Sequence, residues 1–343
     1  MPIYPTTHPT IHVLLCPLTV GSYALGCVDI FSAANKVITH FHPQYPQFKV
    51  QLISHDGKSV MGANNCQLNV QGSLGECQQG DILLIPGIMI NDESELNSHI
   101  KQWPEIIQSL ISAQEKFIKI ISFCTSAFLL AESNLLQKLN ATTAWWLEKA
   151  FIKRYPNTNL KISSTYVDND SITCVGSAQL YQDFCLQLIE SMTHYDIANK
   201  VSSYTMVDYH RKSQLPYSRP WLTHSREPFI DKAQKWITKH ISDDFSIEEL
   251  AAEMAVSKRT LNRRFRQHFQ ESPQGYVQQV RMEKARELLS TTTMQLSKVI
   301  LACGYQDESS FRRNFKRLNS LSPKHYRQQF SNNETFTLNT YKN

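Results

Sequence analysis

Two segments in the last third of the chain repeat one pattern, and this repeat constrains the fold more than any other feature of the sequence. Residues 261–277 read LNRRFRQHFQESPQGYV, and residues 311–327 read FRRNFKRLNSLSPKHYR. The same kind of residue recurs 50 positions later in six places: Leu261 and Phe311, Arg263 and Arg313, Phe265 and Phe315, Ser272 and Ser322, Pro273 and Pro323, and Tyr276 and Tyr326. Upstream, Leu250 corresponds to Val299 and Ala255 to Gly304, 49 positions later. Such a repeat indicates that one small structural unit has been duplicated.

Each copy predicts a helix, a tight turn and a second helix. The three segments are 246–254, 255–257 and 258–269 in the first copy, and 294–303, 304–306 and 307–318 in the second. Ser246 and Ser257 are expected to cap helices, because a Ser hydroxyl accepts a hydrogen bond from a free amide at a helix start. Gly304 suits a left-handed turn position, and Asp307 and Glu308 are favourable at a helix N-terminus.

The second helix of each copy has an apolar stripe and a basic face. Leu261 and Phe265 stand four positions apart and are expected to face the core, as are Phe311 and Phe315. The residues expected to point outward are Arg259, Arg263 and Arg266 in the first copy, and Arg312, Arg313, Lys316 and Arg317 in the second. A helix of this kind can lie in the major groove of DNA and contact guanine edges and phosphates. The alternative is a merely solvated helix face, and the occurrence of two such copies favours DNA binding.

The charge distribution agrees with a polyanionic partner for one end of the chain. Residues 226–330 hold 19 Lys and Arg against 12 Asp and Glu, a net charge of +7, whereas residues 1–225 have a net charge of −2. A basic block on a slightly acidic body is typical of a nucleic-acid-binding domain attached to a domain of another kind.

On these residues, the block 226–330 resembles the AraC-type DNA-binding domain, with ILACGYQDESSFRRNFKRLNSLSPKHYR as its second-copy signature. The resemblance implies that a long helix, 275–289, joins two helix-turn-helix units and separates their recognition helices by about one duplex turn. The DNA-binding candidates that it implies are Arg259, Asn262 and Arg263, then Ser309, Arg312 and Arg313 facing bases, with Lys258, Arg266 and Lys316 beside them. The family usually has Gly where Gln270 and Ser320 stand here, which implies a local adjustment of the loop.

The first half of the chain alternates strand-like and helix-like segments, which predicts a parallel sheet covered by helices on both faces. The expected strands are 11–17, 48–54, 81–87 and 116–122, the expected helices are 28–38, 93–114 and 177–192, and 163–176 is expected to be a hairpin. A proline-containing stretch, 213–228, is predicted to be a linker to the helical block 229–330, and 331–343 a tail. The fold class is therefore α/β followed by an all-α domain.

Other sequence features exclude several classes of protein. No run of about 18 apolar residues predicts a transmembrane helix, and the N-terminus lacks the pattern of a signal peptide. The eight Cys form neither a CxxC motif nor a Cys/His metal spacing, so we expect no metal, no cofactor and a reducing cytoplasm.

Cys124 directly follows the strand-like segment KFIKIIS and precedes an apolar helix pattern. A sharp strand-to-helix turn of this kind presents the nucleophile of many hydrolases. The segments IHVLLCP, GCVDIFSAAN, DILLIPGI, SFCTSAFLLAESNLL, NATTAWW, CVGSAQLYQDFCLQLI and DYHRKSQLPY resemble, in this order, the PfpI-type branch of the class I glutamine amidotransferase-like superfamily. Their fusion to an AraC-type block resembles GlxA-type transcriptional regulators, and implies a flavodoxin-like parallel-sheet sandwich over residues 10–212 that serves sensing and dimerisation.

The catalytic residues that this resemblance implies are mostly replaced. Active members pair the elbow Cys with a His and an acid, but here Ala144 stands at the His position and Tyr23 at that of the acid. Ser126 and Ile88 replace two turn glycines, although the Ile88 amide is expected to stay available as a donor. A thiol without a basic neighbour is a weak nucleophile at neutral pH. We therefore expect no catalytic residue, with Cys124 a vestigial nucleophile.

The former catalytic pocket is a candidate effector site, as the resemblance to this regulator family implies. Its expected lining is Tyr23, Ile88, Cys124, Ser126, Ala144 and Trp145. Tyr23 and Trp145 can offer aromatic faces to a cationic ligand, whereas the alternative places Trp145 and Trp146 in the core. His210, Arg211 and Gln214 match a family motif without an assigned role, and a structural salt link is the simpler interpretation.

The predicted function is that of a DNA-binding transcriptional regulator that responds to a small metabolite. Its expected partners are double-stranded promoter DNA, a small-molecule effector and a second copy of the chain, with RNA polymerase as a further candidate. Two alternatives stay open: a Cys-dependent hydrolase or deglycase with a DNA-targeting tail, and a regulator that needs no effector. The sequence does not indicate the effector, the operator, the regulated genes, or activation as against repression.

Overall fold

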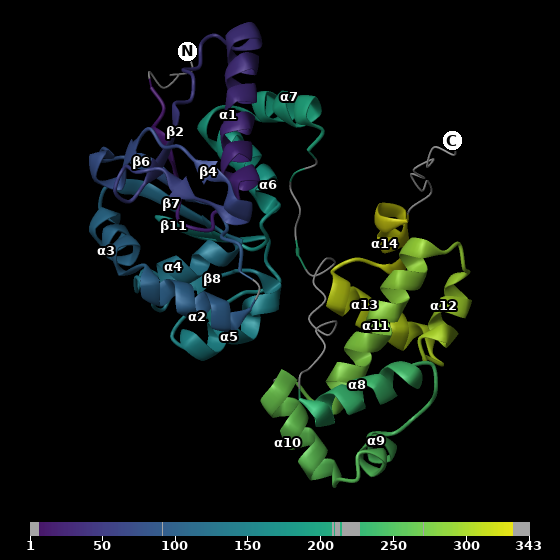
Figure 1. Cartoon of the computed structure of the whole chain (residues 1–343). Helices are drawn as coiled ribbons and strands as arrows, with labels where there is room; N and C mark the ends of the chain where they lie inside the picture. The colour runs from purple at the N-terminus through teal and green to yellow at the C-terminus, as the bar shows by residue number, and fades with distance from the viewer. Residues whose placement is uncertain are drawn as a thin grey trace, which may run out of the picture. The chain divides into compact units, whose positions relative to one another are not determined.

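A computed structural model of the whole chain divides into two compact units, Met1–Gln214 and Leu215–Asn343 (Figure 1). It describes residues 7–90, 92–207, 209, 213–214, 227–269 and 271–331. The division falls inside the stretch that the sequence predicts to be a linker. Most of that stretch, 215–226, and the predicted tail beyond 331 lie outside the described residues.

The N-terminal unit is built on a seven-stranded sheet with the strand order β10-β11-β7-β6-β1-β2-β5. Neighbouring strands are parallel except for the antiparallel edge pair β10 and β11. The strands are β1 (Ile11–Leu14), β2 (Val50–Ser54), β5 (Gly72–Ser73), β6 (Asp81–Ile85), β7 (Phe117–Phe123), β10 (Tyr166–Asn169) and β11 (Ile172–Val175). Two minor pairs lie outside this sheet: β3 (Val60–Met61) with β4 (Gln67–Leu68), and β8 (Asn140–Ala141) with β9 (Asn159–Leu160).

Helices cover both faces of this sheet, as the sequence predicts (Figure 1). One face carries α1 (Gly21–Phe41), α6 (Leu180–Met192) and α7 (Tyr195–Thr205), and the other α2 (Glu93–Gln102), α3 (Pro104–Ala113), α4 (Ala127–Glu132) and α5 (Glu148–Arg154). Residues of β6 alternate between the two cores: Ile82 and Leu84 belong to the core under α1, and Leu83 and Ile85 to the core under α3. A sheet buried on both faces explains why its strands read as continuous apolar runs.

The predicted elements of this unit are observed, but the helix expected at 28–38 begins seven residues earlier, as α1, and one element is wrong. The hairpin expected at 163–176 is formed by β10 and β11, with Asp170 in its turn at φ 60°. The single helix expected at 93–114 is wrong, because the chain forms α2 and α3 with a break at Trp103. Pro104 causes this break, since proline has no amide hydrogen to continue the helix and excludes helical backbone at the residue before it.

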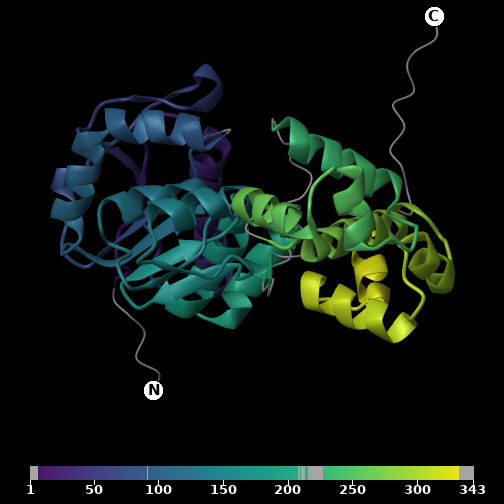
Figure 2. The same ribbon diagram turned by 90° about the horizontal axis from the view of Figure 1, so that it is seen from below.

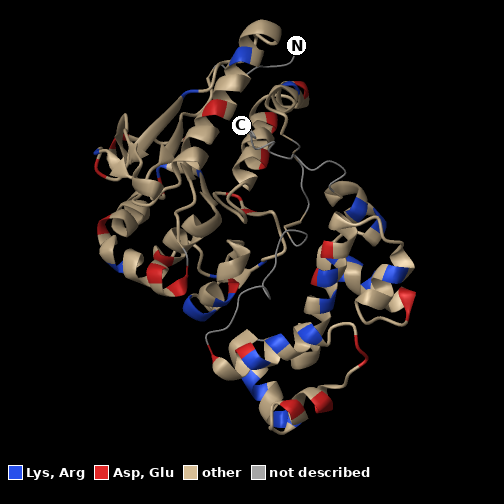
Figure 3. Ribbon diagram, turned by 45° about the vertical axis from the view of Figure 1, so that its right-hand side comes forward, with Lys and Arg blue, Asp and Glu red and all other residues tan. Residues whose placement is uncertain are grey.

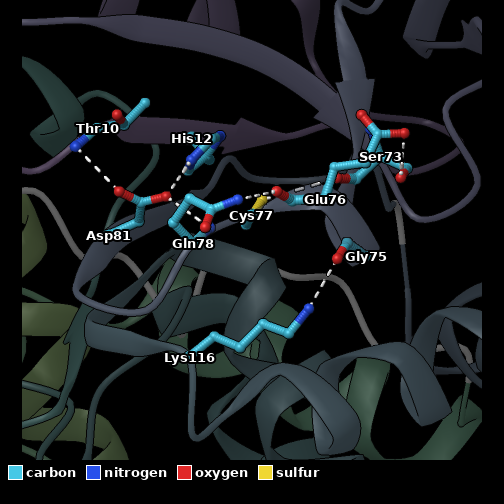
Figure 4. Close-up of polar contacts among 9 residues, drawn as sticks. All are labelled: Thr10, His12, Ser73, Gly75, Glu76, Cys77, Gln78, Asp81 and Lys116. Atoms are coloured by element: carbon cyan, nitrogen blue, oxygen red, sulfur yellow. Dashed lines mark hydrogen bonds and ion pairs between the residues drawn. The ribbon is translucent and has the colours of Figure 1, made fainter.

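The buried carboxylate of Asp81 holds the N-terminal ends of the neighbouring strands β1 and β6 together (Figure 4). Asp81, at the start of β6, accepts hydrogen bonds from the amides of Thr10 (3.1 Å) and Gln78 (3.0 Å). It also pairs with the Nε2 atom of His12 at 2.8 Å, and both side chains are nearly inaccessible to solvent. This cluster lies at the edge of the sheet opposite to the one reached by Cys124.

The described part of the C-terminal unit contains helices and no strand, as predicted (Figures 1 and 2). Its helices are α8 (Pro228–Lys239), α9 (Ile247–Glu253), α10 (Lys258–Phe269), α11 (Pro273–Thr291), α12 (Leu296–Ala302), α13 (Glu308–Asn319) and α14 (Pro323–Phe330). Two separate apolar cores form, one for each copy of the repeat. Helix α11 joins them, because Tyr276 near its start belongs to the first core and Met282 to the second. No helix among the described residues has both the length and the apolar character to cross a membrane.

Candidate functional site

Helices α10 and α13, the second helices of the two copies, bury an apolar stripe and leave a basic face in solvent. Leu261 and Phe265 of α10, and Phe311 and Phe315 of α13, are fully buried. Among the candidate DNA contacts, Asn262 is half-buried, and the exposed ones are Lys258, Arg259, Arg263, Arg266, Ser309, Arg312, Arg313 and Lys316. Figure 3 shows Lys and Arg recurring along the helices of this unit. The two copies therefore present equivalent basic surfaces.

The turns that precede these helices have the same backbone conformation in both copies. Ala255 and Gly304, which correspond in the repeat, both have left-handed backbone, with φ 53° and φ 72°. Ser257 caps α10 as expected, since its Oγ atom accepts from the Thr260 amide at 3.2 Å. Ser320, which stands where the family usually has Gly, adopts φ 58° itself. The loop there has the left-handed backbone that a glycine readily adopts. Gln270 lies outside the described residues, and the predicted loop adjustment stays a prediction.

Some of the basic side chains already have acidic neighbours, and others do not. Arg312 pairs with Glu308 at 2.6 Å, and Lys258 pairs with Glu248. Within the described part of the chain, five candidates make no ion pair: Arg259, Arg263, Arg266, Arg313 and Lys316. Asp307 caps α13 by accepting from the Ser310 amide at 2.7 Å, and this hydrogen bonding lowers the pKa of its carboxyl. The negative charge of Asp307 also stabilises α13, because the N-terminus is the positive end of the helix dipole.

Cys124 occupies a strand-to-helix elbow, as predicted. The strand β7 ends at Phe123, Cys124 has φ 57°, and α4 begins three residues later at Ala127. A positive φ is rare for a residue with a side chain and marks a sharply turned backbone. The elbow lies at the carboxyl end of β7, next to β6 and the switch in strand order between β6 and β1, where open α/β sheets bind their ligands.

The environment of the Cys124 thiol opposes ionisation. The residue is only 2% exposed, and burial raises the pKa of its thiol to about 12. The hydrogen bonds around the sulfur favour the thiolate but do not offset this desolvation, and no cationic side chain contributes. A thiol that stays protonated at neutral pH is a poor nucleophile.

The expectation that the Ile88 amide stays available as a donor is wrong. This amide donates to the Oγ1 atom of Thr125 at 2.8 Å, and that hydroxyl donates back to the Ile88 carbonyl at 2.8 Å. Both groups are buried, so the pair closes the position at which an oxyanion would be bound. The Ser126 hydroxyl is likewise engaged, because it lies 2.7 Å from the Ile85 carbonyl and accepts from the Phe123 amide.

The other residues expected around the elbow lie close to it. Burial and the proximity of Cys124 raise the pKa of the half-buried Tyr23. Thr143 donates to the Cys124 carbonyl at 2.8 Å, which places the buried Ala144 beside the elbow. Trp145 is half-buried and Trp146 is 40% exposed, so the alternative that places both rings in the core is wrong.

Comparison with known proteins identifies the C-terminal unit. The sequence model of the helix-turn-helix domain family matches residues 250–329. The chain therefore carries a helix-turn-helix domain. It is 26% identical to the HTH-type transcriptional regulator CdhR of Pseudomonas aeruginosa over 292 residues, which cover 84% of this chain and 83% of CdhR. Its identity to the HTH-type transcriptional regulator GbdR of the same species is 21% over 286 residues, covering 82% of this chain and 75% of GbdR. The chain is thus a DNA-binding transcriptional regulator.

A solved ThiJ/PfpI family protein from Pseudomonas syringae is similar to this chain over 73% of the chain and 91% of that protein. The TM-score is 0.48 and the sequence identity 13%. The observed sheet with helices on both faces, followed by a helix-turn-helix domain, is the order of domains that the resemblance to GlxA-type regulators implies.

Sequence reasoning missed the side chains that connect this regulator's elbow to the end of its N-terminal unit. Gln214 is buried and donates through Nε2 to the Thr142 hydroxyl (3.2 Å), the Thr143 carbonyl (3.4 Å) and the Ile162 carbonyl. Gln214 therefore acts here through hydrogen bonds. The salt link predicted for this motif stays a prediction, because its charged members, His210 and Arg211, lie outside the described residues. The family motif around Gln214 was the signal for its role, but its partners are far away in sequence.

Proposed function

We propose that the chain regulates transcription by reading two blocks of double-stranded promoter DNA with α10 and α13, and that its N-terminal unit binds a small effector without catalysing a reaction. The duplication carries the DNA-reading part: two copies of one helix-turn-helix each bury an apolar stripe and expose a basic face. An exposed helix of this kind fits the major groove, where Arg bonds to guanine in a bidentate way and Asn to adenine.

The proposed contacts follow from position on the two helices. Arg259, Asn262 and Arg263 in α10, and Ser309, Arg312 and Arg313 in α13, are assigned to base edges, and Lys258, Arg266 and Lys316 to the phosphate backbone. The ion pairs of Arg312 and Lys258 do not oppose this assignment. Ion pairs between exposed side chains contribute about 0–1 kcal/mol, so a phosphate or a guanine can replace the carboxylate.

The N-terminal unit is proposed to sense a ligand at the elbow. The assigned site is Tyr23, Ile88, Cys124, Ser126, Ala144 and Trp145, and the half-buried rings of Tyr23 and Trp145 favour a cationic ligand. The hydroxyls of Thr125 and Ser126 already satisfy the backbone here, so apolar and aromatic contacts are expected to dominate. We assign 10–212 to sensing and pairing with a second copy, 213–228 to a linker, 229–330 to DNA binding and 331–343 to a tail.

The effector is proposed to act by favouring one arrangement of the two DNA-binding domains over another. A ligand can shift such an equilibrium only by the difference in its affinity for the two states. The regulator is proposed to act in the cytoplasm, with RNA polymerase as a further partner. If a confirmed ligand leaves DNA affinity, DNA geometry and transcription unchanged, this coupling is wrong.

Selection of bound sequences from a random duplex library with the full-length protein tests the DNA-reading part. Near-physiological salt suppresses contacts made only to phosphates, because these weaken steeply as salt increases. We expect enrichment of a motif with two blocks about one helical turn, ~34 Å, apart. Failure to enrich any motif, alone or with a metabolite extract, would contradict the proposal and reopen a catalytic role for Cys124.

A thermal-shift screen with metabolites separates a sensor from a regulator that needs no effector. A ligand at about 100 times its dissociation constant stabilises the unit that binds it by ~2.7 kcal/mol. We expect at least one cationic compound to raise the unfolding temperature of the wild-type chain, and substitution of Tyr23 by Ala to abolish the shift. Turnover assays with hydrolase and deglycase substrates test the enzymatic alternative, for which we expect no activity above a Cys124→Ala control.

A further inference from the structure

The loop between α8 and α9 contacts the turn of the second helix-turn-helix, although this loop belongs to the first copy of the repeat. The Ser242 hydroxyl donates to the Ala302 carbonyl at 2.8 Å and accepts from the Nζ atom of Lys284 at 2.7 Å. Gln306 donates to the Asp244 carboxylate at 3.2 Å. We call these contacts, made by loop 241–245 and turn 302–306, the junction.

Arg281, in the middle of α11, lies between the two sides of the junction. Its guanidinium donates to the Asp243 carbonyl at 2.8 Å. Its Cζ atom lies 5.7 Å from the centre of the Phe245 ring and 5.8 Å from that of the Tyr305 ring. Such contacts between a cation and an aromatic face stabilise the cation wherever water is partly excluded.

Tyr305 extends the junction to the recognition helix itself. Its ring lies edge-to-face against that of Phe311 in α13, with centres 5.4 Å apart. Its hydroxyl accepts from Asn314 of the same helix at 3.3 Å. A displacement of loop 241–245 would therefore be transmitted through Arg281 and Tyr305 to α13.

The difference between Gly304 and Ala255 indicates that close approach matters at this turn. Both residues have left-handed backbone, so Ala255 demonstrates that a methyl group is compatible with this conformation. The side chain of Ala255 is exposed, whereas a Cβ atom on Gly304 would lie 2.7 Å from the Ile241 carbonyl oxygen. The backbone of the first copy thus occupies the space that a side chain at position 304 would need.

We propose that the junction fixes the separation of α10 and α13, and so makes the regulator measure the spacing between the two blocks of its operator. This inference rests on the proposed two-block reading. One inserted base pair moves the second block by ~3.4 Å and rotates it by about 35°, which a rigid pair of helices cannot follow. Helix α11 joins the two copies along the chain, and the junction adds direct contacts between loop 241–245 of the first copy and turn 302–306 of the second.

The test compares affinities for the duplex selected by the full-length chain and for two derivatives with one base pair inserted or deleted between the blocks. We expect the wild-type chain to lose about tenfold in affinity on either change, comparable to the loss of one specific base contact. Gly304→Ala displaces loop 241–245, and Ser242→Ala removes two of its hydrogen bonds. Each variant is expected to alter the ratio between native and changed spacing by about threefold or more.

Ala255→Gly is the matched control, because it alters the equivalent turn of the first copy, where the side chain is exposed. It should keep the wild-type ratio. If Gly304→Ala and Ser242→Ala fold but keep that ratio, or if the wild type tolerates both changes in spacing, the junction does not set the spacing. Should Gly304→Ala lose its helical circular dichroism, Ser242→Ala decides alone. Failure of the wild type to select two blocks would contradict the proposed function instead.

Discussion

Arg263 and Arg313 occupy equivalent positions in the two copies, and both are exposed on the face opposite the buried stripe. Arg263→Ala and Arg313→Ala are each expected to weaken binding to the selected duplex by about 1–3 kcal/mol and to relax specificity at a few bases, because a bidentate contact to guanine is lost. Titration against duplexes with single base substitutions measures both effects.

Arg264 provides a control with the same loss of charge at the neighbouring position. It is half-buried, its guanidinium lies 4.2 Å from the centre of the Phe229 ring, and it is 3.6 Å from Glu227. Arg264→Ala should leave base preference unchanged. An equal loss of affinity on all duplexes for Arg263→Ala would instead make Arg263 a phosphate contact, and the salt dependence of binding would then decrease.

The reactivity of the Cys124 thiol tests whether this residue is a vestigial nucleophile. With a pKa of about 12, its thiol stays protonated at neutral pH, and its thiolate fraction increases about tenfold for each pH unit up to that value. Alkylation of Cys124 by iodoacetamide should therefore be undetectable near pH 7 and appear only in alkaline solution, as followed by peptide mass spectrometry. The exposed Cys66 of the same chain is the internal control. Labelling of Cys124 as fast as Cys66 at pH 7 would contradict its assignment as vestigial.

At the scale of elements, the N-terminus of α13 depends on a charge, unlike those of α11 and α14. Asp307 caps α13 with its pKa lowered by hydrogen bonds to Ser310, whereas Ser272 and Ser322 cap the other two helices with hydroxyls. A group with a lowered pKa in the folded state adds stability above its ordinary pKa, and this stability is lost as the pH falls below it. We expect the first turn of α13 to lose hydrogen-exchange protection below about pH 4.

The substitution Asp307→Asn separates this effect from general acid unfolding. Asparagine keeps an oxygen that accepts hydrogen bonds and is a good N-cap, but it does not titrate. In this variant the protection of the Ser309 and Ser310 amides, taken relative to the intrinsic exchange rate at each pH, should no longer depend on pH between neutral and acid pH. The first turns of α11 and α14 serve as references in the same sample. Equal protection losses in all three helices would contradict a specific role for Asp307.

Local patterns predict most elements of this chain because each is long enough to show a period or a cap. The recognition helices were predicted within one residue, since their apolar stripe, caps and turn residues all agree. The strands β5 and β8 have two residues each and no period, so their existence depends on pairing with distant strands. Pro104 indicates the break at Trp103, but an apolar period that continues across it favours a single helix.

The candidate sites likewise have some features that local sequence predicts and others that depend on contacts between distant segments. The exposed basic faces follow from spacing on a helix, and the elbow follows from a strand that runs into a helix. The hydrogen bonds that close the elbow do not, since Ile88 and Thr125 are 37 residues apart and meet only when β6 and β7 pair. The same holds for the junction, where Ser242 and Ala302 are 60 residues apart. Such a contact cannot be predicted from the periodicity or the motifs of a single segment.

At the scale of the whole molecule, one chain of hydrogen bonds leads from the elbow to the last residue of the N-terminal unit. Thr143 donates to the Cys124 carbonyl, and Gln214 donates to the Thr143 carbonyl. The side chain of Gln214 also packs closely against Gly176. A Cβ atom added at Gly176 would lie 2.6 Å from the Nε2 atom of Gln214. A ligand that moves the elbow would therefore alter the support of the residue at which the chain leaves this unit.

Thr143→Val tests whether this connection transmits ligand binding to DNA binding. Valine keeps the shape of threonine but removes the hydroxyl that bonds to Cys124, and Thr143→Ser is the matched control because it keeps that hydroxyl. With a compound found by thermal shift, we expect the wild type and Thr143→Ser to change their affinity for the selected duplex about 5-fold or more, within the usual range of coupling between sites. Thr143→Val should still be stabilised by the compound, yet change its DNA affinity by less than about twofold, as measured by duplex titration with and without the compound. An undiminished coupling in Thr143→Val would mean that the effect travels by another route, since retained stabilisation shows that the ligand is still bound.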